Sequence, residues 1–290
     1  MTDIGTPGTR FRTALEAERP LQLVGAVNAY SALLAEHAGF RGVYLSGAGV
    51  ANASLGLPDL AVTTLHDVVI DVRRITSASP LPLLVDADTG FGNALMIGRA
   101  VREIAAAGAA GLHLEDQVAD KRCGHRPNKG LVSTQEMVSR LRAAAGARPD
   151  PGFVIMARTD AFAGEGLDGA LRRIERYIEA GADMLFPEAL TELEQYRRVA
   201  DATGVPVLAN ITEFGETPLF TLEELRQAGV AIALYPLTAF RAMAAAAESA
   251  YATLRREGTQ RGIVDRMQTR ARLYEHLNYI ELERRMDSGE

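Results

Sequence analysis

Cysteine, tryptophan and long apolar stretches are what this sequence has least of. Its 290 residues contain one cysteine, Cys123, and no tryptophan. One thiol cannot form an intrachain disulfide, which suits a reducing cytoplasm, and with five histidines it excludes a zinc cluster of cysteine and histidine. No run approaches about 18 uninterrupted apolar residues, and the first ten residues lack the apolar core of a signal peptide. We therefore expect a soluble cytoplasmic protein that does not associate with membranes.

An excess of positive charge is also missing. The chain has 31 lysines and arginines against 37 acidic residues, a formal net charge of −6. A general nucleic-acid binder needs a basic face to neutralise phosphates, so we expect no nucleic-acid partner. Apolar residues make up 47% of the chain, which predicts a globular protein with a substantial core.

Short apolar runs recur along the chain, separated by amphipathic stretches. Several runs are apolar almost throughout, as is typical of parallel strands covered on both faces. The predicted strands are 21–28, 42–46, 81–88, 111–115, 153–159, 184–188, 205–210 and 231–235, and the predicted helices include 96–107, 135–145 and 167–180.

An Ala-Gly pair precedes four of these strands, at 38–39, 107–108, 180–181 and 228–229. Glycine there suits a helix C-terminus that turns back toward a sheet. Alternation of strand and helix over this length favours a closed barrel over an open doubly wound sheet, and no glycine-rich nucleotide-binding motif follows the first strand. We predict one (β/α)8 TIM-type barrel domain over 1–290, with roughly 237–290 forming C-terminal helices at 238–257 and 265–285.

Polar residues stand at the C-terminal ends of most predicted strands. They are Ser46, Asp86, Asp88, Glu115, Arg158, Glu188 and Asn210. Active sites of such barrels occupy this face. The pattern therefore predicts an enzyme site at that end of the barrel.

Asp86 and Asp88 close the third predicted strand, where strand alternation places both on one side. Two crowded carboxylates repel, so one takes a proton or a cation lies between them, and Mg²⁺ prefers such oxygen ligands. A helix cap is the alternative role. On the next strand, Glu115 is a better candidate than Asp116 for binding metal-bound water, since Asp116 could cap a helix.

The only cysteine lies between Lys121-Arg122 and His125. Neighbouring cations favour the thiolate, so we expect Cys123 to ionise readily and to exchange a proton near neutral pH. A surface loop with a chance cysteine is the alternative.

Arginines and a second histidine complete the candidates. Arg158, Arg241 and Arg270 are candidates for carboxylate binding, although most arginines are exposed solubilising groups. His113 lies inside a predicted strand, and we expect it to be packed.

Together these motifs resemble the isocitrate lyase/phosphoenolpyruvate mutase superfamily over residues 23–279. The matching segments are 85–92, 115–117, 121–129, 156–160, 185–189, 208–214 and 267–270. The Lys-Arg-Cys-Gly-His loop is specific for the lyase branch, whereas Asp-Ala-Asp marks the superfamily generally. The resemblance implies Mg²⁺-dependent cleavage of a small tricarboxylate, 2-methylisocitrate, to pyruvate and succinate in propionate catabolism, with Mn²⁺ as a possible substitute ion.

The resemblance also implies roles for individual residues. Asp86, Asp88 and Glu115 would bind the metal. The catalytic residues would be Cys123, as general acid, with Lys121, Arg122 and His125. The substrate-binding residues would be Tyr44, Ser46, Gly47, Ala48, Cys123, Gly124, Arg158, Glu188, Asn210, Ile211, Thr212, Arg241 and Arg270. An apolar pocket of Phe186, Leu234 and Pro236 would select the methyl group. The family further implies a mobile cysteine loop and a homotetramer that exchanges a terminal helix between subunits.

One segment departs from the family. The substrate loop usually carries three glycines after its serine, but here it contains Ala48. The added methyl narrows the site, or restricts the backbone if a positive φ is needed. A lyase acting on 2,3-dimethylmalate or isocitrate is therefore an alternative function. The other alternative is a non-catalytic barrel that binds small carboxylates, and such a protein would lack the acidic pair or the cysteine.

Overall fold

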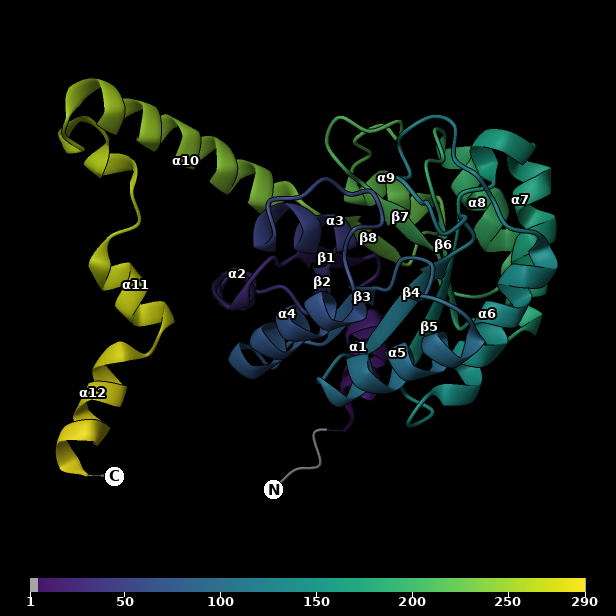
Figure 1. Cartoon of the computed structure of the whole chain (residues 1–290), viewed down its shortest axis with the longest axis horizontal. Coiled ribbons are helices and arrows are strands. Elements are labelled where there is room, and N and C mark those ends of the chain that lie inside the picture. The colour runs from purple at the N-terminus through teal and green to yellow at the C-terminus, as the bar shows by residue number, and fades with distance from the viewer. Residues whose placement is uncertain (1–4, 290) are drawn as a thin grey trace. The chain divides into compact units, whose positions relative to one another are not determined.

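Eight parallel strands form the centre of the computed structural model, which describes residues 5–289 (Figure 1). The strands are β1 (Leu21–Gly25), β2 (Val43–Leu45), β3 (Leu83–Asp86), β4 (Gly111–Glu115), β5 (Val154–Thr159), β6 (Met184–Pro187), β7 (Leu208–Asn210) and β8 (Ile232–Tyr235). Their order in the sheet is β6-β5-β4-β3-β2-β1-β8-β7. A parallel bridge between Leu185 and Val207 joins the two edges, so the sheet closes on itself. The predicted (β/α)8 barrel is confirmed.

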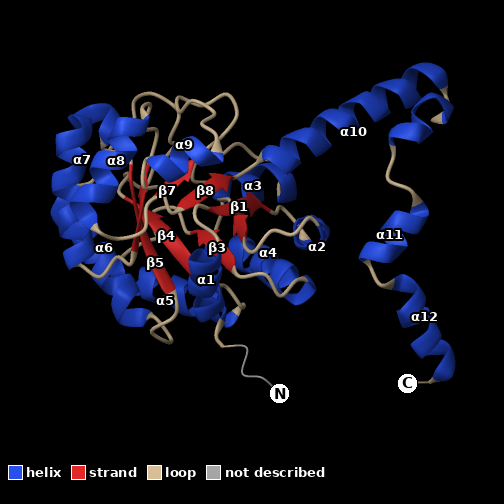
Figure 2. Ribbon diagram, turned by 180° about the vertical axis from the view of Figure 1, so that it is seen from behind, coloured by secondary structure: helices blue, strands red, loops and turns tan. Residues whose placement is uncertain are grey.

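Helices follow nearly every strand and surround the sheet, as Figure 2 shows in blue around the red strands. They are α1 (Pro7–Ala17), α2 (Ala29–His37), α3 (Gly47–Gly49), the π-helix η1 (Val50–Ser54), α4 (Leu65–Ala78), α5 (Ala94–Ala106), α6 (Thr134–Ala147), α7 (Phe162–Glu179), α8 (Leu193–Thr203), α9 (Leu222–Gln227), α10 (Thr238–Glu257), the 3-10 helix η2 (Arg261–Arg266), α11 (Arg270–His276) and α12 (Tyr279–Ser288).

Each of the eight predicted strands contains an observed one. The Ala-Gly pairs also lie where predicted: the alanines are the C-caps of α2, α5, α7 and α9, and each following glycine has a positive φ. A left-handed residue at this point reverses the chain toward the next strand at little steric cost in glycine. The pairs therefore set where four helices end.

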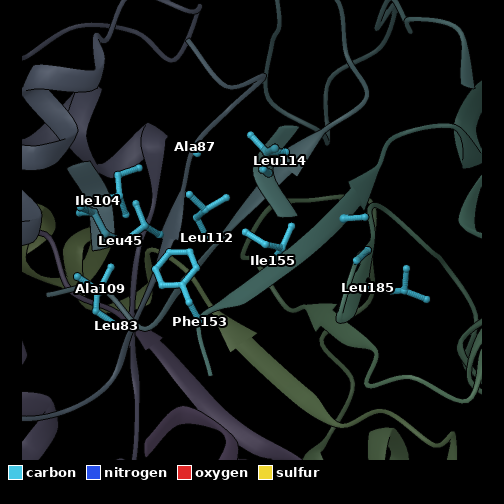
Figure 3. Packing of buried hydrophobic residues seen from close by; sticks show 14 of the residues in the cluster. Leu45, Leu83, Ala87, Ile104, Ala109, Leu112, Leu114, Phe153, Ile155 and Leu185 are labelled. Atoms are coloured by element: carbon cyan, nitrogen blue, oxygen red, sulfur yellow. The ribbon is translucent and has the colours of Figure 1, made fainter. Parts of the chain in front are cut away.

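The outer core lies between the strands and the helices. Figure 3 shows part of it, with labelled side chains such as Leu45, Leu112, Ile155 and Leu185 from four strands. All four are fully buried. Burial of apolar side chains is the main favourable contribution to the free energy of folding, so this core stabilises the barrel.

The inner core fills the barrel itself and changes character along its axis. On β5, Val154 and Met156 belong to the inner core and Arg158 follows two residues later; on β6, Phe186 is followed by Glu188. Because side chains alternate along a strand, these residues share the inner face. The interior is therefore apolar at its base and polar at the C-terminal mouth.

Helix α1 was not anticipated from the sequence. Its Phe11 and Leu15 are buried in the same cluster as the inner strand residues Leu21 and Leu84. The helix begins at a Thr6 cap, whose side chain accepts from the Thr9 N–H. It thereby covers the end of the barrel opposite the mouth.

The chain divides into two compact units, one up to Thr238 and one from Ala239 onward. Helix α10 matches its predicted range, but the single helix predicted over 265–285 is wrong. Met267 is extended (φ −90°, ψ 150°) and Asn278 is left-handed (φ 51°), so the segment breaks into η2, α11 and α12. In the described part of the chain, every helix is too short or too polar to cross a bilayer.

Candidate active site

Three acidic side chains meet at the mouth of the barrel. Carboxylate oxygens of Asp86, Asp88 and Glu115 lie within 4.8 Å of one another, and all three residues are buried. Strand β3 ends at Asp86, and Asp88 has a left-handed φ of 48°. The Asp88 N–H donates to Asp86 Oδ1 at 3.0 Å. A tight turn, not strand alternation, therefore brings the two aspartates together.

The helix-cap alternatives are wrong for these residues. The N-cap of α5 is Asn93, and that of α6 is Ser133. Asp116 instead accepts hydrogen bonds from Thr159 Oγ1 (2.7 Å) and Tyr177 Oη (2.8 Å), so it joins β4 to β5 and α7.

The three carboxyl groups of the cluster have strongly shifted pKa values. Burial would raise the pKa of Asp86, but nearby His113 and Lys121 lower it to about 2. Burial and the charge of Asp86 raise the pKa of Asp88 to about 6, and burial raises that of Glu115 well above its usual range. The carboxyls therefore repel each other in a confined space and would gain from an added cation.

The donor set fits a hard divalent cation. Glu115 Oε1 is buried and has no hydrogen-bond partner among residues 5–289. The Gly47 N–H donates to Asp86 Oδ2 at 3.0 Å, and a Cβ at Gly47 would lie 3.0 Å from Asp88 Oδ1. Glycine at this position therefore leaves room beside both aspartates. Clustered carboxylate oxygens are the ligands that Mg²⁺ and related ions prefer.

The cysteine loop, residues 121–129, lies across this mouth. Lys121 Nζ pairs with Asp59 and lies 2.7 Å from Asp88 Oδ1. Burial would lower the pKa of Lys121, but the surrounding carboxylates raise it, so the side chain stays charged. A Cβ added at Gly124 would overlap Arg158 and Glu188. Lys121 and Gly124, the residues on either side of the 122–123 segment, both contact the barrel mouth, so Cys123 is held close to it.

The expected ease of ionisation of Cys123 is wrong. Burial raises the pKa of its thiol, although part of the side chain is exposed to solvent. Lys121 does not compensate, because its ammonium is paired with Asp59 and Asp88. A raised pKa keeps the thiol protonated, which is the state that a general acid needs.

His125 holds the far side of the loop against β6 and β7. Its Nδ1 accepts from the Glu216 N–H at 3.0 Å, so the ring proton is on Nε2 and points to Glu188 Oε1 at 3.1 Å. Asn210 Nδ2 also lies 3.3 Å from Glu188 Oε1. Burial would raise the pKa of Glu188, but Arg158 and His125 hold it well below its usual range. Glu188 is therefore an anionic acceptor at the mouth.

Arg158 connects the two sides of the site. Its guanidinium lies 3.2 Å from Glu115, 3.0 Å from Asp160 and 3.3 Å from Glu188. Its central carbon also lies 5.3 Å from the centre of the Phe186 ring. These contacts fix the guanidinium plane at the mouth, where it is almost fully buried.

Tyr44 and His113 lie below the acidic cluster. Tyr44 Oη is 2.8 Å from His113 Nε2, which is 3.5 Å from Asp86 Oδ1. Burial lowers the pKa of His113 to about 4, so the ring is neutral. The prediction that His113 is packed is confirmed, and the Tyr44 hydroxyl binds the imidazole.

Ala48 causes no backbone strain. Residues 47–49 form the short helix α3, which follows Ser46, and Ala48 is not among the described residues with positive φ. A positive φ, the condition under which its methyl group would restrict the backbone, is therefore not needed at this position. The methyl group is partly exposed.

The other predicted site residues fall into four groups. Ile211 packs in the outer core, and Thr212 is buried next to it in the chain. The members of the proposed selectivity pocket are all buried: Phe186, Leu234 and Pro236. Arg241 in α10 and Arg270 in α11 belong to the second unit. Arg122 is exposed, and its carbonyl accepts from Gln117 Nε2 at 2.9 Å.

Sequence reasoning missed Asp59, Lys129 and Asp160. Asp160 follows two residues after the predicted Arg158, a spacing that places it on the same side of the chain. Asp59 lies in an irregular loop with no periodicity to mark it. A cavity of about 520 Å³ also reaches Asp88 and Lys121 from the α4–α5 side, with Thr63 in its lining.

The sequence and the fold are similar to those of known proteins. A sequence model described as phosphoenolpyruvate phosphomutase matches residues 11–255. The 2-methylisocitrate lyase of Salmonella typhimurium is 64% identical over 98% of this chain and 96% of its own, and that of Escherichia coli is 62% identical over the same shares. A crystal structure of 2,3-dimethylmalate lyase superposes with a TM-score of 0.90 at 34% identity, covering 99% of this chain and 96% of that one.

Proposed function

The chain belongs to the phosphoenolpyruvate phosphomutase family, and we propose that within it the protein is a metal-dependent carbon–carbon lyase that cleaves 2-methylisocitrate to pyruvate and succinate. Relatives named 2-methylisocitrate lyase are 56–64% identical over nearly the whole chain. We further propose that the enzyme is cytoplasmic and works in the methylcitrate cycle of propionate catabolism.

The observation that carries this proposal is the position of the cysteine loop over the acidic cluster. Lys121 touches Asp88 on one side of Cys123, and Gly124 touches Glu188 on the other. A segment that carries a proton donor therefore lies next to a candidate metal site at the barrel mouth. Superfamily members without this loop lack the proton donor.

Asp86, Asp88 and Glu115 would hold Mg²⁺, with Mn²⁺ as a possible substitute. When bound, the ion would supply electrophilic stabilisation of negative charge on the substrate's hydroxyl and carboxylate oxygens. The acidic residues would orient the hydroxy-acid end of the substrate toward β3 and β4. The Gly47 N–H would keep Asp86 in place through its 3.0 Å hydrogen bond.

Cys123 would donate the proton that completes the reaction. The substrate hydroxyl would lose its proton to a carboxylate at the barrel mouth, and cleavage of the carbon–carbon bond would then form the carbonyl of pyruvate and leave the bonding electron pair on the succinate fragment. The protonated thiol of Cys123 would add its proton to that carbon. Lys121, Arg122 and His125 would hold the loop in position while this occurs.

The remaining contacts would bind the substrate carboxylates. Ser46, Gly47 and Ala48 would line one end with Tyr44 beneath them, and Gly124, Arg158, Glu188, Asn210, Ile211 and Thr212 would surround the other. Arg241 and Arg270 would clamp carboxylates through charge. Phe186, Leu234 and Pro236 would prefer the extra methyl group, but one methyl in an apolar pocket separates two substrates by only about 1–3 kcal/mol.

The second unit supports a homotetramer with exchanged terminal helices. Large apolar side chains on α10 and α12 are exposed, among them Tyr251, Ile280 and Met286. Many large apolar side chains left exposed in one part of a chain are typical of a protein contact surface. A second copy of the chain would cover them.

The test is a comparative assay of the purified protein. With Mg²⁺ and 2-methylisocitrate we expect release of pyruvate, which stops when a chelator removes the metal. The same assay with isocitrate and with 2,3-dimethylmalate gives the ratio of kcat/KM values. We take 2,3-dimethylmalate as the second candidate substrate, because a crystal structure of 2,3-dimethylmalate lyase superposes on this chain with a TM-score of 0.90. No pyruvate from 2-methylisocitrate would exclude the assignment.

A further inference from the structure

Two lysines stand at the ends of the cysteine loop, and each pairs with a carboxylate on the barrel. Lys121 pairs with Asp88, which follows β3, and Lys129 Nζ lies 2.9 Å from Asp160 Oδ1, which follows β5. Cys123 lies between these two attachments. The loop is therefore fixed at both ends rather than at one hinge.

Lys129 also binds within its own loop. Its Nζ donates to the carbonyl oxygen of Gly124 as well as to Asp160. That carbonyl belongs to the residue directly after Cys123, so the lysine holds the chain next to the thiol. Only 5% of the Lys129 side chain is exposed.

The anchor on the barrel is itself rigidly held. Asp160 accepts from Arg158 Nε at 3.0 Å and from Arg158 Nη2 at 3.2 Å, and its side chain is completely buried. Its N–H donates to Asp116 Oδ1 at 2.9 Å, and Asp116 is fixed in turn by Tyr177. Lys129 thus attaches the loop to a carboxylate that has little freedom to move.

Charge balance adds a reason for the contact to form. Asp160, Glu115 and Glu188 share one cation, Arg158. Placing Lys129 there supplies a second positive charge to a buried group of acids, where unpaired charge is costly. Moving the loop away would remove that charge.

We propose that Lys129 is a positioning residue, which latches the loop to Asp160 and fixes the Cys123–Gly124 segment over the acidic cluster. The contribution to turnover rests on the proposed lyase function, whereas the latch itself does not. Within residues 5–289, the side-chain partners of Lys129 are the Gly124 carbonyl oxygen and Asp160, and neither is a candidate metal ligand or the thiol. Its loss should therefore misplace the proton donor without emptying the metal site.

The decisive variant is Lys129→Met, which keeps the length of the side chain and removes its charge. Arg126→Met is the matched control, because Arg126 is an exposed cation of the same loop. We expect kcat to fall about 10- to 100-fold in Lys129→Met, as misplacement of a reacting group by about 1 Å does. The Kd for Mg²⁺ should stay within about twofold, and Lys129→Arg should recover part of kcat. Arg126→Met should match the wild type in both quantities.

Amide hydrogen exchange over residues 118–131 tests the latch without any turnover. We expect amide exchange in this segment to be faster than in the wild type in both Lys129→Met and Asp160→Asn. The double variant should exchange no faster than either single variant, because both substitutions break the same contact between Lys129 and Asp160. Exchange at wild-type rates in Lys129→Met would overturn the proposal, and so would fully additive acceleration in the double variant. If the wild type released no pyruvate, the lyase assignment would fail, while the exchange result would still decide the latch.

Discussion

The two units of this chain differ in what they bury. The barrel up to Thr238 has an outer and an inner apolar core, and its mouth collects the charged residues of the site. From Ala239 onward, the buried residues in the described chain are only Thr253, Ile263 and His276. Helix α12 buries none.

Because of this difference, we expect substitutions in the barrel to affect stability and substitutions in the second unit to affect assembly. A unit that encloses its own apolar residues can stabilise itself, whereas one that exposes them depends on another surface. The barrel therefore has what it needs to hold the acidic cluster and the cysteine loop. The second unit leaves large apolar side chains such as Tyr251, Ile280 and Met286 exposed.

The largest expected effect is in the barrel's chemistry. Cys123→Ser should lower kcat about 10²- to 10⁴-fold, because the hydroxyl is a far weaker proton donor than the thiol. Steady-state pyruvate release measures the loss, and sedimentation should show an unchanged particle mass. Near wild-type turnover would remove Cys123 from the mechanism.

The next effect concerns the barrel's own core. Phe11→Ala should lower the free energy of unfolding by about 3–5 kcal/mol, because Phe11 is fully buried at the base of the barrel. Thr13→Ala on the exposed side of α1 should change it by less than about 0.5 kcal/mol. Urea titration followed by circular dichroism measures both. Equal losses in the two variants would mean that α1 does not pack as a structural part of the barrel.

A change in the second unit should act on assembly instead. The double variant Ile280→Glu, Met286→Glu places two charges on the exposed apolar residues of α12, which should disfavour burial against another copy. Sedimentation velocity should show smaller particles, while the barrel still unfolds cooperatively. A wild-type particle mass would show that α12 lies outside the subunit contact.

The smallest effect is a shift in pH dependence. Burial raises the pKa of the Cys123 thiol, and the thiol donates only while protonated, that is, below its pKa. Turnover should therefore persist beyond about pH 8.5, the ordinary value for a thiol, and decline only at higher pH. The rate of alkylation of Cys123 should rise over the same range, since the thiolate is the reactive form. A decline in kcat centred below pH 8 would contradict the raised pKa.

Much of this architecture could be predicted from local pattern. The apolar runs predicted the positions of all eight strands, and the polar residues at the ends of most of them indicated which end of the barrel holds the site. The breaks near Met267 and Asn278 could not be predicted, because the charge pattern of 265–285 is also compatible with one continuous helix. The turn at Asp88 was missed for a similar reason, since a left-handed aspartate leaves no periodic signal.

The state of the thiol also depended on the fold. Next to Lys121 in the sequence, Cys123 looked easy to ionise, but in space that lysine is paired with Asp59 and Asp88. Neighbours along the chain are a poor guide to the electrostatic environment of a loop, because the pKa of a side chain depends on its burial and on the charges close to it in space.

The sequence by itself determined the succession of strands and helices, the acidic pair, the cysteine loop and the resemblance to a family, because these depend on residue types at short spacing. The tertiary structure alone decided which charges meet. Lys121 on Asp88, Lys129 on Asp160 and Asp116 beneath Thr159 each join residues from separate elements. Closing the barrel brings strand ends that are far apart in the chain within a few ångströms, and only then do their burial and pairing fix the protonation states of the site.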